Sequence, residues 1–130
     1  LVNTLIDMGE ITGISKEESI TTFIGGIVRS VRFGAASSHG KANMMCYNYM
    51  EEHKAFTRNE DGTYHIDFEK ALECVNSWAD LVLTTQGEGN YAFAKAYAAD
   101  HANIGEALAA DVAKVNALGI PRDIRFEWAW

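Results

Sequence analysis

The stretch RSVRFGAASSHGKAN, residues 29–43, ends one predicted helix and begins the next, and the rest of the chain is organised around it. Three of its residues are basic and one is a histidine, in a chain whose formal net charge is -7. Gly34 is expected to stop the first helix, because glycine readily adopts the left-handed backbone that often follows a helix end. Ser37 or Ser38 can cap the second helix with its hydroxyl group. The sequence therefore predicts a short polar junction between two helices.

The helix before this junction has a strong start at Ser15. Glu18 follows three residues later, which is the capping-box spacing, in which each side chain bonds the backbone N–H of the other residue. The apolar residues beyond it recur at the spacing of one helical face, and they are Ile20, Phe23, Ile24, Ile27, Val28 and Val31. We therefore expect a helix that ends near residues 33–34 and buries this face.

Two pairs of residues in this helix lie outside that simple pattern. Arg29 lies about 180° from the apolar face and Arg32 lies on its flank, so in an isolated domain both would be solvated. Gly25 and Gly26 occupy the helix interior, where each glycine costs ~1 kcal/mol relative to alanine. Close packing or a bend is the expected reason for the glycine pair.

The helix after the junction is expected to run to about Lys54 and to change character along one face. That face spans roughly 40° and carries His39, Asn43, Cys46 and Met50, with Tyr47 at its edge. Two interpretations stay open. In one, the apolar residues are core, and His39 and Asn43 finish the face where it meets solvent. In the other, the polar pair belongs to a site, since histidine titrates near neutral pH.

The remaining segments complete a mainly α fold. They predict a first helix from Leu1 to about Met8, a hairpin of residues 55–58 and 63–66, helices capped by Asp67 and Asn90, and a sixth helix stopped at residues 119–121. His65 is expected on the hairpin surface and His101 in the last turn of the fifth helix. The prediction is about six helices, one small β-hairpin and a strand-like C-terminal tail, in a single domain of residues 1–130.

Both ends of the sequence suggest a piece of a longer protein. Leu1 opens a helical pattern with no cap before it. At the other end Ile124, Phe126, Trp128 and Trp130 alternate as in a strand, and a strand needs a neighbour. We expect these apolar segments to be exposed in the isolated chain, which could associate through them as a homodimer.

Composition argues against two classes of partner. The chain has 18 acidic and 11 basic residues and a pI near 5.0. Binding to nucleic acid or to an anionic membrane surface needs a basic face, so neither partner is expected. No apolar run approaches the ~20 residues of a membrane span.

Metal binding by this chain alone is not expected either. Cys46 and Cys74 match no metal or redox spacing and are expected as reduced, partly buried thiols. The four histidines are scattered, and no two lie four residues apart as in a zinc protease helix. We expect no cofactor held by this chain.

Four segments together resemble a known family. They are VRFGAASSHGKAN at 31–43, DGTYHID at 61–67 leading into a long helix, TQGEGNY at 85–91 and GIPRD at 119–123. In this order and spacing they look like the C-terminal part of bacterial members of the dipeptidyl peptidase III family of zinc metallopeptidases. The resemblance covers the chain well from Arg29 onward and more loosely before it.

The resemblance implies a parent enzyme that removes dipeptides from the N-termini of peptides. The family holds zinc with two His of H-E-x-x-G-H and a Glu of a following E-E-x-x-A-type motif, and neither motif occurs here. Glu51-Glu52-His53 lacks the second histidine, and Glu17-Glu18 is explained by the capping box. The expected role is therefore cleft wall and substrate contacts without zinc ligands. Zinc would belong to the parent enzyme, and the partners would be the remainder of that enzyme and a peptide substrate.

Site residues follow from the same resemblance. The family places a histidine at the start of this helix, facing the cleft, so the expected catalytic residue is His39, which would help to hold the substrate and the developing oxyanion. Asn43, Lys41 and Arg32 are expected to contact substrate, and Asn43 stands where animal enzymes tend to have arginine. The alternative is a helical protein-interaction module without catalysis. An H-E-x-x-G-H motif upstream of Leu1 in the gene would decide between them.

Overall fold

The computed structural model describes residues 1–124 and 126–127 and confirms a mainly α fold. Within this described part there are six helices and one two-stranded antiparallel sheet. In chain order the elements are α1 Val2–Asp7, α2 Lys16–Val31, α3 Ser38–Glu52, β1 Phe56–Arg58, β2 Tyr64–Ile66, α4 Phe68–Gly87, α5 Tyr91–His101 and α6 Glu106–Ala117. None of the described helices is long and apolar enough to cross a membrane.

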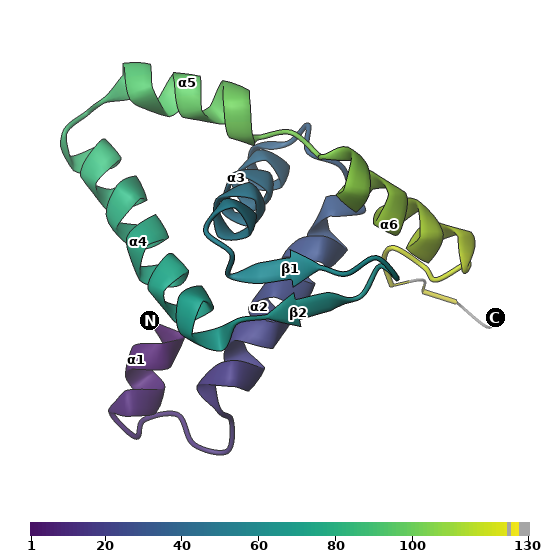
Figure 1. Cartoon of the computed structure of the whole chain (residues 1–130), viewed down its shortest axis with the longest axis horizontal. Helices are drawn as coiled ribbons and strands as arrows, with labels where there is room; N and C mark the ends of the chain where they lie inside the picture. Colours follow the sequence, from purple (N-terminus) through teal and green to yellow (C-terminus); the bar gives the residue numbers. More distant parts are fainter. Residues whose placement is uncertain (125, 128–130) are drawn as a thin grey trace.

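Helix α3 lies at the centre of this arrangement. It contacts α2, α4, α5 and strand β1, and α4 and α5 contact each other (Figure 1). Helix α6 lies on the far side of the hairpin from α4, and α1 lies apart near the start of α2 (Figure 1). Because α3 is surrounded on several sides, its apolar residues make up much of the core, and its N-terminal turn emerges beside the junction that follows α2.

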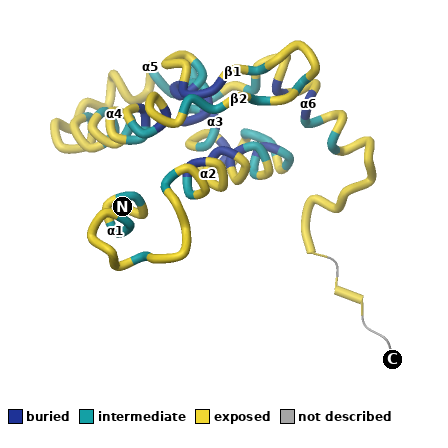
Figure 2. Tube along the Cα trace, turned by 60° about the horizontal axis from the view of Figure 1, so that its bottom comes forward, coloured by how far each residue is buried: buried dark blue, intermediate teal, exposed yellow. Residues whose placement is uncertain are grey.

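The core is built mainly between α2 and α3, where Figure 2 shows buried positions along both helices. The fully buried side chains with the largest volume are Phe56, Met44 and Met50. Most of the predicted face of α2 is also buried, including Ile20, Ile24, Ile27 and Val31. Phe23 is an exception, because 45% of it stays exposed. The prediction that Phe23 belongs to the core was therefore wrong.

Helix starts agree closely with the sequence. In the capping box, Ser15 donates its backbone N–H to Glu18 Oε2 at 2.8 Å, and the Glu18 N–H donates to Ser15 Oγ at 3.1 Å. Helix α3 is capped by Ser37, whose Oγ accepts from the Gly40 N–H at 3.0 Å. Asp67 and Asn90 cap α4 and α5 as predicted. Capping groups therefore determine where these helices begin.

The C-terminal tail departs from its prediction. Residues 120–124 and 126–127 have no strand structure, and Ile124 and Phe126 are 75% and 78% exposed. A strand requires a hydrogen-bonded neighbour, and β1 and β2 already pair with each other, with Phe56 opposite Ile66. The other two residues of the predicted alternation, Trp128 and Trp130, lie outside the described residues.

Candidate functional site

The junction between α2 and α3 packs directly on the first turn of α3. Gly40 is buried there, and a Cβ atom on it would collide with the Gly34 carbonyl oxygen and lie 2.9 Å from Ala35 Cα. Gly34 itself has a φ of 90°, which glycine adopts without strain. The junction and the start of α3 therefore form one closely packed unit that holds the backbone of residue 39.

Three of the predicted site residues lie on the first turns of α3. His39 and Lys41 are exposed and Asn43 is half-buried, whereas Cys46 and Met50 further along are buried. Among the described residues, none forms a hydrogen bond with the His39 ring. The apolar end of the predicted face is thus core, and its polar end is at the surface with an imidazole available to another molecule.

Arg32 is placed differently, because its side chain is used within the chain. Its Nε donates to Asn116 Oδ1 at 3.0 Å, and its Nη2 donates to the Ile120 carbonyl at 2.5 Å. Arg122 Nη1 in turn donates to the Arg32 carbonyl at 3.2 Å. Arg32 therefore ties the end of α2 to the end of α6 and to the segment that follows it.

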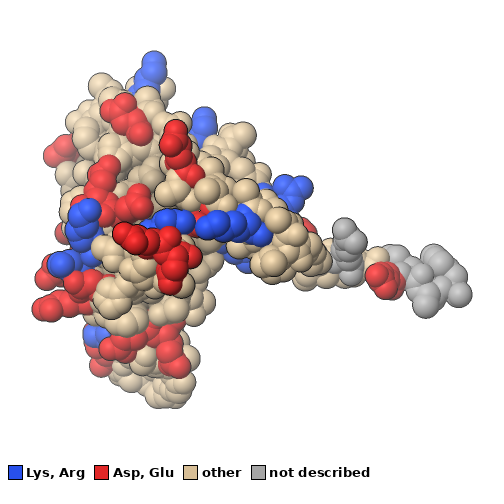
Figure 3. Space-filling model, turned by 45° about the vertical axis from the view of Figure 1, so that its right-hand side comes forward, with Lys and Arg blue, Asp and Glu red and all other residues tan. Residues whose placement is uncertain are grey.

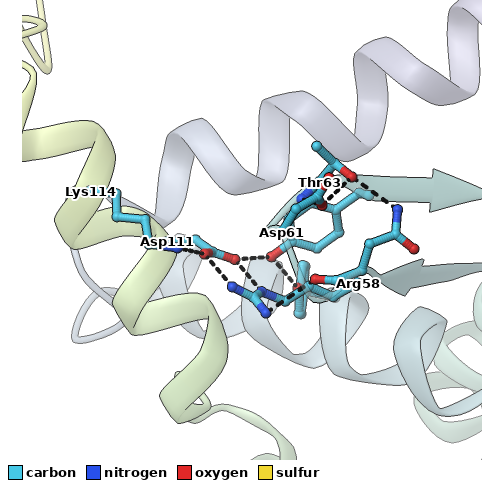
Figure 4. Close-up of polar contacts among 8 residues, drawn as sticks. Arg58, Asp61, Thr63, Asp111 and Lys114 are labelled. Atoms are coloured by element: carbon cyan, nitrogen blue, oxygen red, sulfur yellow. Dashed lines mark hydrogen bonds and ion pairs between the residues drawn. The ribbon is translucent and has the colours of Figure 1, made fainter.

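A polar cluster between the hairpin and α6 was missed by the sequence analysis. The Arg58 guanidinium donates to both carboxylate oxygens of Asp111, at 2.6 Å and 2.8 Å (Figure 4). The Tyr64 hydroxyl donates to Asp111 Oδ2 at 2.9 Å, and the Tyr47 hydroxyl donates to Tyr64 at 3.4 Å. Lys114 lies 3.5 Å from Asp111. These contacts fasten α6 to the hairpin and, through Tyr47, to α3.

The electrostatics of this cluster follow from its contacts. Hydrogen bonding from Arg58 holds the pKa of the Asp111 carboxyl well below its usual range, against the opposing effect of burial. Burial raises the pKa of the Tyr47 phenol, and its bond to Tyr64 adds to the increase. Asp111 falls between Leu108 and Val115 on the apolar side of α6, and an aspartate in such a position signals a cationic partner.

Helix α5 is held against α3 by a second set of contacts. Asn48 donates to the His101 carbonyl at 2.7 Å and to the Asn103 carbonyl at 3.0 Å. The His101 ring stacks on Tyr97 with centroids 3.9 Å apart, and its Nε2 lies 3.4 Å from Glu52 Oε1. His101 is therefore a last-turn residue of α5, as predicted, and it serves the packing of two helices.

Two of the apolar hollows among the described residues are large enough to consider as sites, and neither is lined by the predicted site residues. One, of about 520 Å³, lies between α1, α2 and Val75 of α4. The other, of about 340 Å³, lies between α3, α4 and α5 and is lined by Met45, Trp78 and Tyr97 among others.

The potential metal-ligating side chains of the described residues do not gather in one place. Over residues 1–124 and 126–127, no three His, Cys, Asp or Glu residues come together as a metal ligand set. Both cysteines are free and buried, and burial raises the pKa of Cys46 to about 11. On the face shown in Figure 3, acidic and basic side chains are interspersed. The described residues therefore offer no set of three zinc ligands.

The known proteins that this chain matches are much longer than the chain itself. No protein-family model matches it. Nudix hydrolase 3 of Arabidopsis thaliana is 37% identical over 86 residues, which are 66% of this chain and 11% of that protein. The structure of DPP III from Caldithrix abyssi matches 93% of this chain with a TM-score of 0.86 and 30% identity, while the match covers 23% of that chain. The fold is therefore similar to that of one part of DPP III, and the chain spans about a quarter or less of each protein that it matches.

Proposed function

We propose that this chain is a wall of the substrate cleft in a zinc-dependent dipeptidyl peptidase, and that it supplies substrate contacts but no zinc ligands. The observation that carries the proposal is the similarity to DPP III, which extends over 93% of the chain at 30% identity. The surface position of His39, Lys41 and Asn43 on one end of α3 supports it. Zinc would be held by other parts of the enzyme.

In this proposal, the imidazole of His39 is a hydrogen-bond donor that the fold holds in a fixed position. Its helix is anchored by buried Tyr47 and Met50, and its first turn is fixed by the contact of Gly40 with the junction. An imidazole held in this way can donate to a substrate carbonyl as the oxygen gains negative charge, and a donor placed in advance does not have to reorganise during the reaction. Lys41 and Asn43 would contact the peptide beside it.

Arg32 takes a different part in the proposed site. Its guanidinium already donates to Asn116 and to the Ile120 carbonyl. These bonds hold the guanidinium against the end of α6 and the segment that follows it. We therefore assign Arg32 to holding the end of α2 and the junction in place, so that the start of α3 keeps its orientation toward the substrate.

The test is a segment exchange. The matched segment of Caldithrix abyssi DPP III is replaced by this chain, and dipeptide release and zinc content are measured. We expect an active enzyme in which His39→Ala lowers kcat by ~10²–10³-fold with zinc content and melting temperature unchanged. Unchanged kcat, or a loss of stability that explains the loss of activity, would contradict the proposed role of His39. Isolated and dialysed, this chain is expected to hold no stoichiometric zinc.

A second candidate is a helical protein-interaction module without catalysis. It is favoured by the match to a segment of Nudix hydrolase 3, a protein named for a different hydrolase activity. In that case the exchanged enzyme would fold and bind zinc, while His39→Ala, Lys41→Ala and Asn43→Ala would each leave its kinetics unchanged.

A further inference from the structure

An apolar groove of about 520 Å³ opens between α1, α2 and α4. Its lining includes Leu1, Val2, Ile14, Phe23 and Val75. Several of these side chains are unusually exposed for their type, with Leu1 at 90%, Ile14 at 45% and Phe23 at 45%. The described residues of this chain leave the groove open, although its walls are mostly apolar, with Asn3, Glu18, Ser19 and Thr22 as the polar part of the lining.

The side of α2 that borders the groove is also open to solvent. We call Thr22, Phe23, Gly25 and Gly26 the outer face of α2, because all four are exposed while Ile24 and Ile27 on the other side are buried. None of the four carries a charge, in a chain with 18 acidic residues. Figure 2 shows exposed positions along α2, with α1 near its start. An uncharged exposed face of this kind is typical of a surface that another segment covers.

The two glycines give an independent reason to expect a covering segment. A Cβ atom on either Gly25 or Gly26 would meet nothing within 4 Å. Within residues 1–124 and 126–127, therefore, no close contact explains a pair of glycines in the interior of a helix, where they weaken it. Gly40 provides the contrast, because its place is filled by the backbone of residues 34 and 35.

We propose that this groove and the outer face of α2 form a docking surface for an α-helix from the remainder of the peptidase. The inference rests on the proposed function. In Caldithrix abyssi DPP III, 93% of this chain has a structural counterpart that makes up only 23% of the polypeptide, so most of that protein is available to cover this surface. A second copy of this chain is the competing occupant, and the experiment separates the two.

The surface defines the chemistry of the docking helix. Most of its contact side should be aliphatic, since Phe23, Ile14 and Val75 present apolar surface, with a polar position where it meets Glu18. Small residues on α2 let two helix axes come close, so the partner should pack over Gly25 and Gly26. Arg29 is exposed one turn beyond the glycines, and an acidic residue on the partner would complement it.

The experiment compares one substitution in two settings. In the isolated chain, Gly26→Glu should raise the melting temperature by about 2–4 °C, because an exposed helical glycine is replaced by a better helix former. In the exchanged DPP III described above, the same substitution should lower the melting temperature by about 5 °C or more, because it places a charge in the docked interface. This reversal of sign is the expected result.

The matched control is Asn76→Glu on α4. Asn76 is exposed and shares its helix side with Glu73 and Asp80, which marks a face in contact with solvent. Asn76→Glu should change the melting temperature by no more than about 1 °C, both in the isolated chain and in the exchanged DPP III. If the exchanged enzyme is insoluble, glutamate is introduced in Caldithrix abyssi DPP III itself at the residue structurally aligned with Gly26, with the same destabilisation expected.

Three outcomes would overturn the inference. The first is that Gly26→Glu has the same sign in both settings. The second is that the residue aligned with Gly26 tolerates glutamate in DPP III. The third is that the isolated chain sediments as a dimer that Gly26→Glu converts to a monomer, which would assign the surface to a second copy. Dipeptide release is recorded separately, so an exchanged enzyme that shows the reversal without activity contradicts the proposed cleft role alone.

Discussion

Arg58 on the hairpin and Asp111 on α6 form a two-point ion pair, with N–O distances of 2.6 Å and 2.8 Å. Asp111 is the one charged residue among the described positions that is buried. Its carboxylate also accepts from Tyr64 and lies near Lys114, so its oxygens are well satisfied (Figure 4). This pair joins two parts of the chain that are 53 residues apart in sequence.

Asp111→Asn should destabilise the isolated chain. The amide keeps the shape of the carboxylate but loses its charge, and one of its two acceptor positions becomes a donor that faces the Arg58 guanidinium. Charge-assisted hydrogen bonds contribute more than the ~1 kcal/mol typical of neutral ones, so the melting temperature should fall by about 5 °C or more. Thermal unfolding followed by circular dichroism measures this. Asp100→Asn on the exposed side of α5 is the control, and equal effects of the two substitutions would contradict the structural role of the pair.

The same carboxylate should make stability depend on acid pH. Because the folded state lowers the pKa of Asp111, the folded chain keeps this group ionised while the unfolded chain protonates near pH 4. The stabilising contribution is therefore complete above that pH and is lost progressively as the pH falls toward the lower, folded-state pKa. Urea unfolding between pH 7 and pH 2 should show that the free energy of unfolding falls less steeply with pH for Asp111→Asn than for the native chain. Parallel pH profiles of the two proteins would show that Asp111 does not contribute to the acid dependence of stability.

Gly40→Ala and Gly26→Ala should act in opposite directions. A methyl group on Gly40 would overlap the Gly34 carbonyl oxygen and crowd Ala35, so the junction has to move away from α3. A methyl group on Gly26 meets nothing and improves helix propensity by up to ~1 kcal/mol. We expect a melting temperature several degrees lower for the first variant and slightly higher for the second. If both variants were more stable than the native chain, the close contact at Gly40 would be disproved.

Both thiols should be inert in the folded chain. Burial raises the pKa of Cys46 to about 11, with the nearby Cys74 adding to the effect, and burial also raises the pKa of Cys74. A thiol reacts as its thiolate, and a raised pKa makes the thiolate scarcer at pH 8. Ellman's reagent should therefore modify neither cysteine in the native state and both in urea. Rapid modification of one thiol without denaturant would show that the α3–α4 interface opens.

Local signals in the sequence were sufficient to predict the helices and the hairpin, but not the conformation of the C-terminal tail. Ser15, Ser37, Asp67 and Asn90 each cap the helix that was expected to begin there, because a cap acts within a few residues of the chain. Tertiary contacts were harder to foresee. Periodicity assigned Phe23 to the core, but it cannot tell which flank of a helix a neighbouring element covers.

In the candidate site, too, the sequence predicted what depends on local signals and did not predict what depends on tertiary contacts. The exposed position of His39 and the buried positions of Cys46 and Met50 follow from where the helix begins and which side packs. The Arg32 side chain donates hydrogen bonds to carbonyl groups that are 88 and 89 residues away in sequence. The Arg58 side chain bonds Asp111, which is 53 residues away on α6. Pairings of this kind are decided by chain topology, and no local pattern in the sequence reports them.

The reciprocal bonds of Arg32 and Arg122 also have a mechanical consequence. Arg32 holds the Ile120 carbonyl, and Arg122 holds the Arg32 carbonyl, so residues 120–122 and the end of α2 move together. The junction of residues 32–37 is covalently continuous with this clamp and rests on Gly40. A pull on the segment after α6 would therefore be transmitted through the clamp to the first turn of α3.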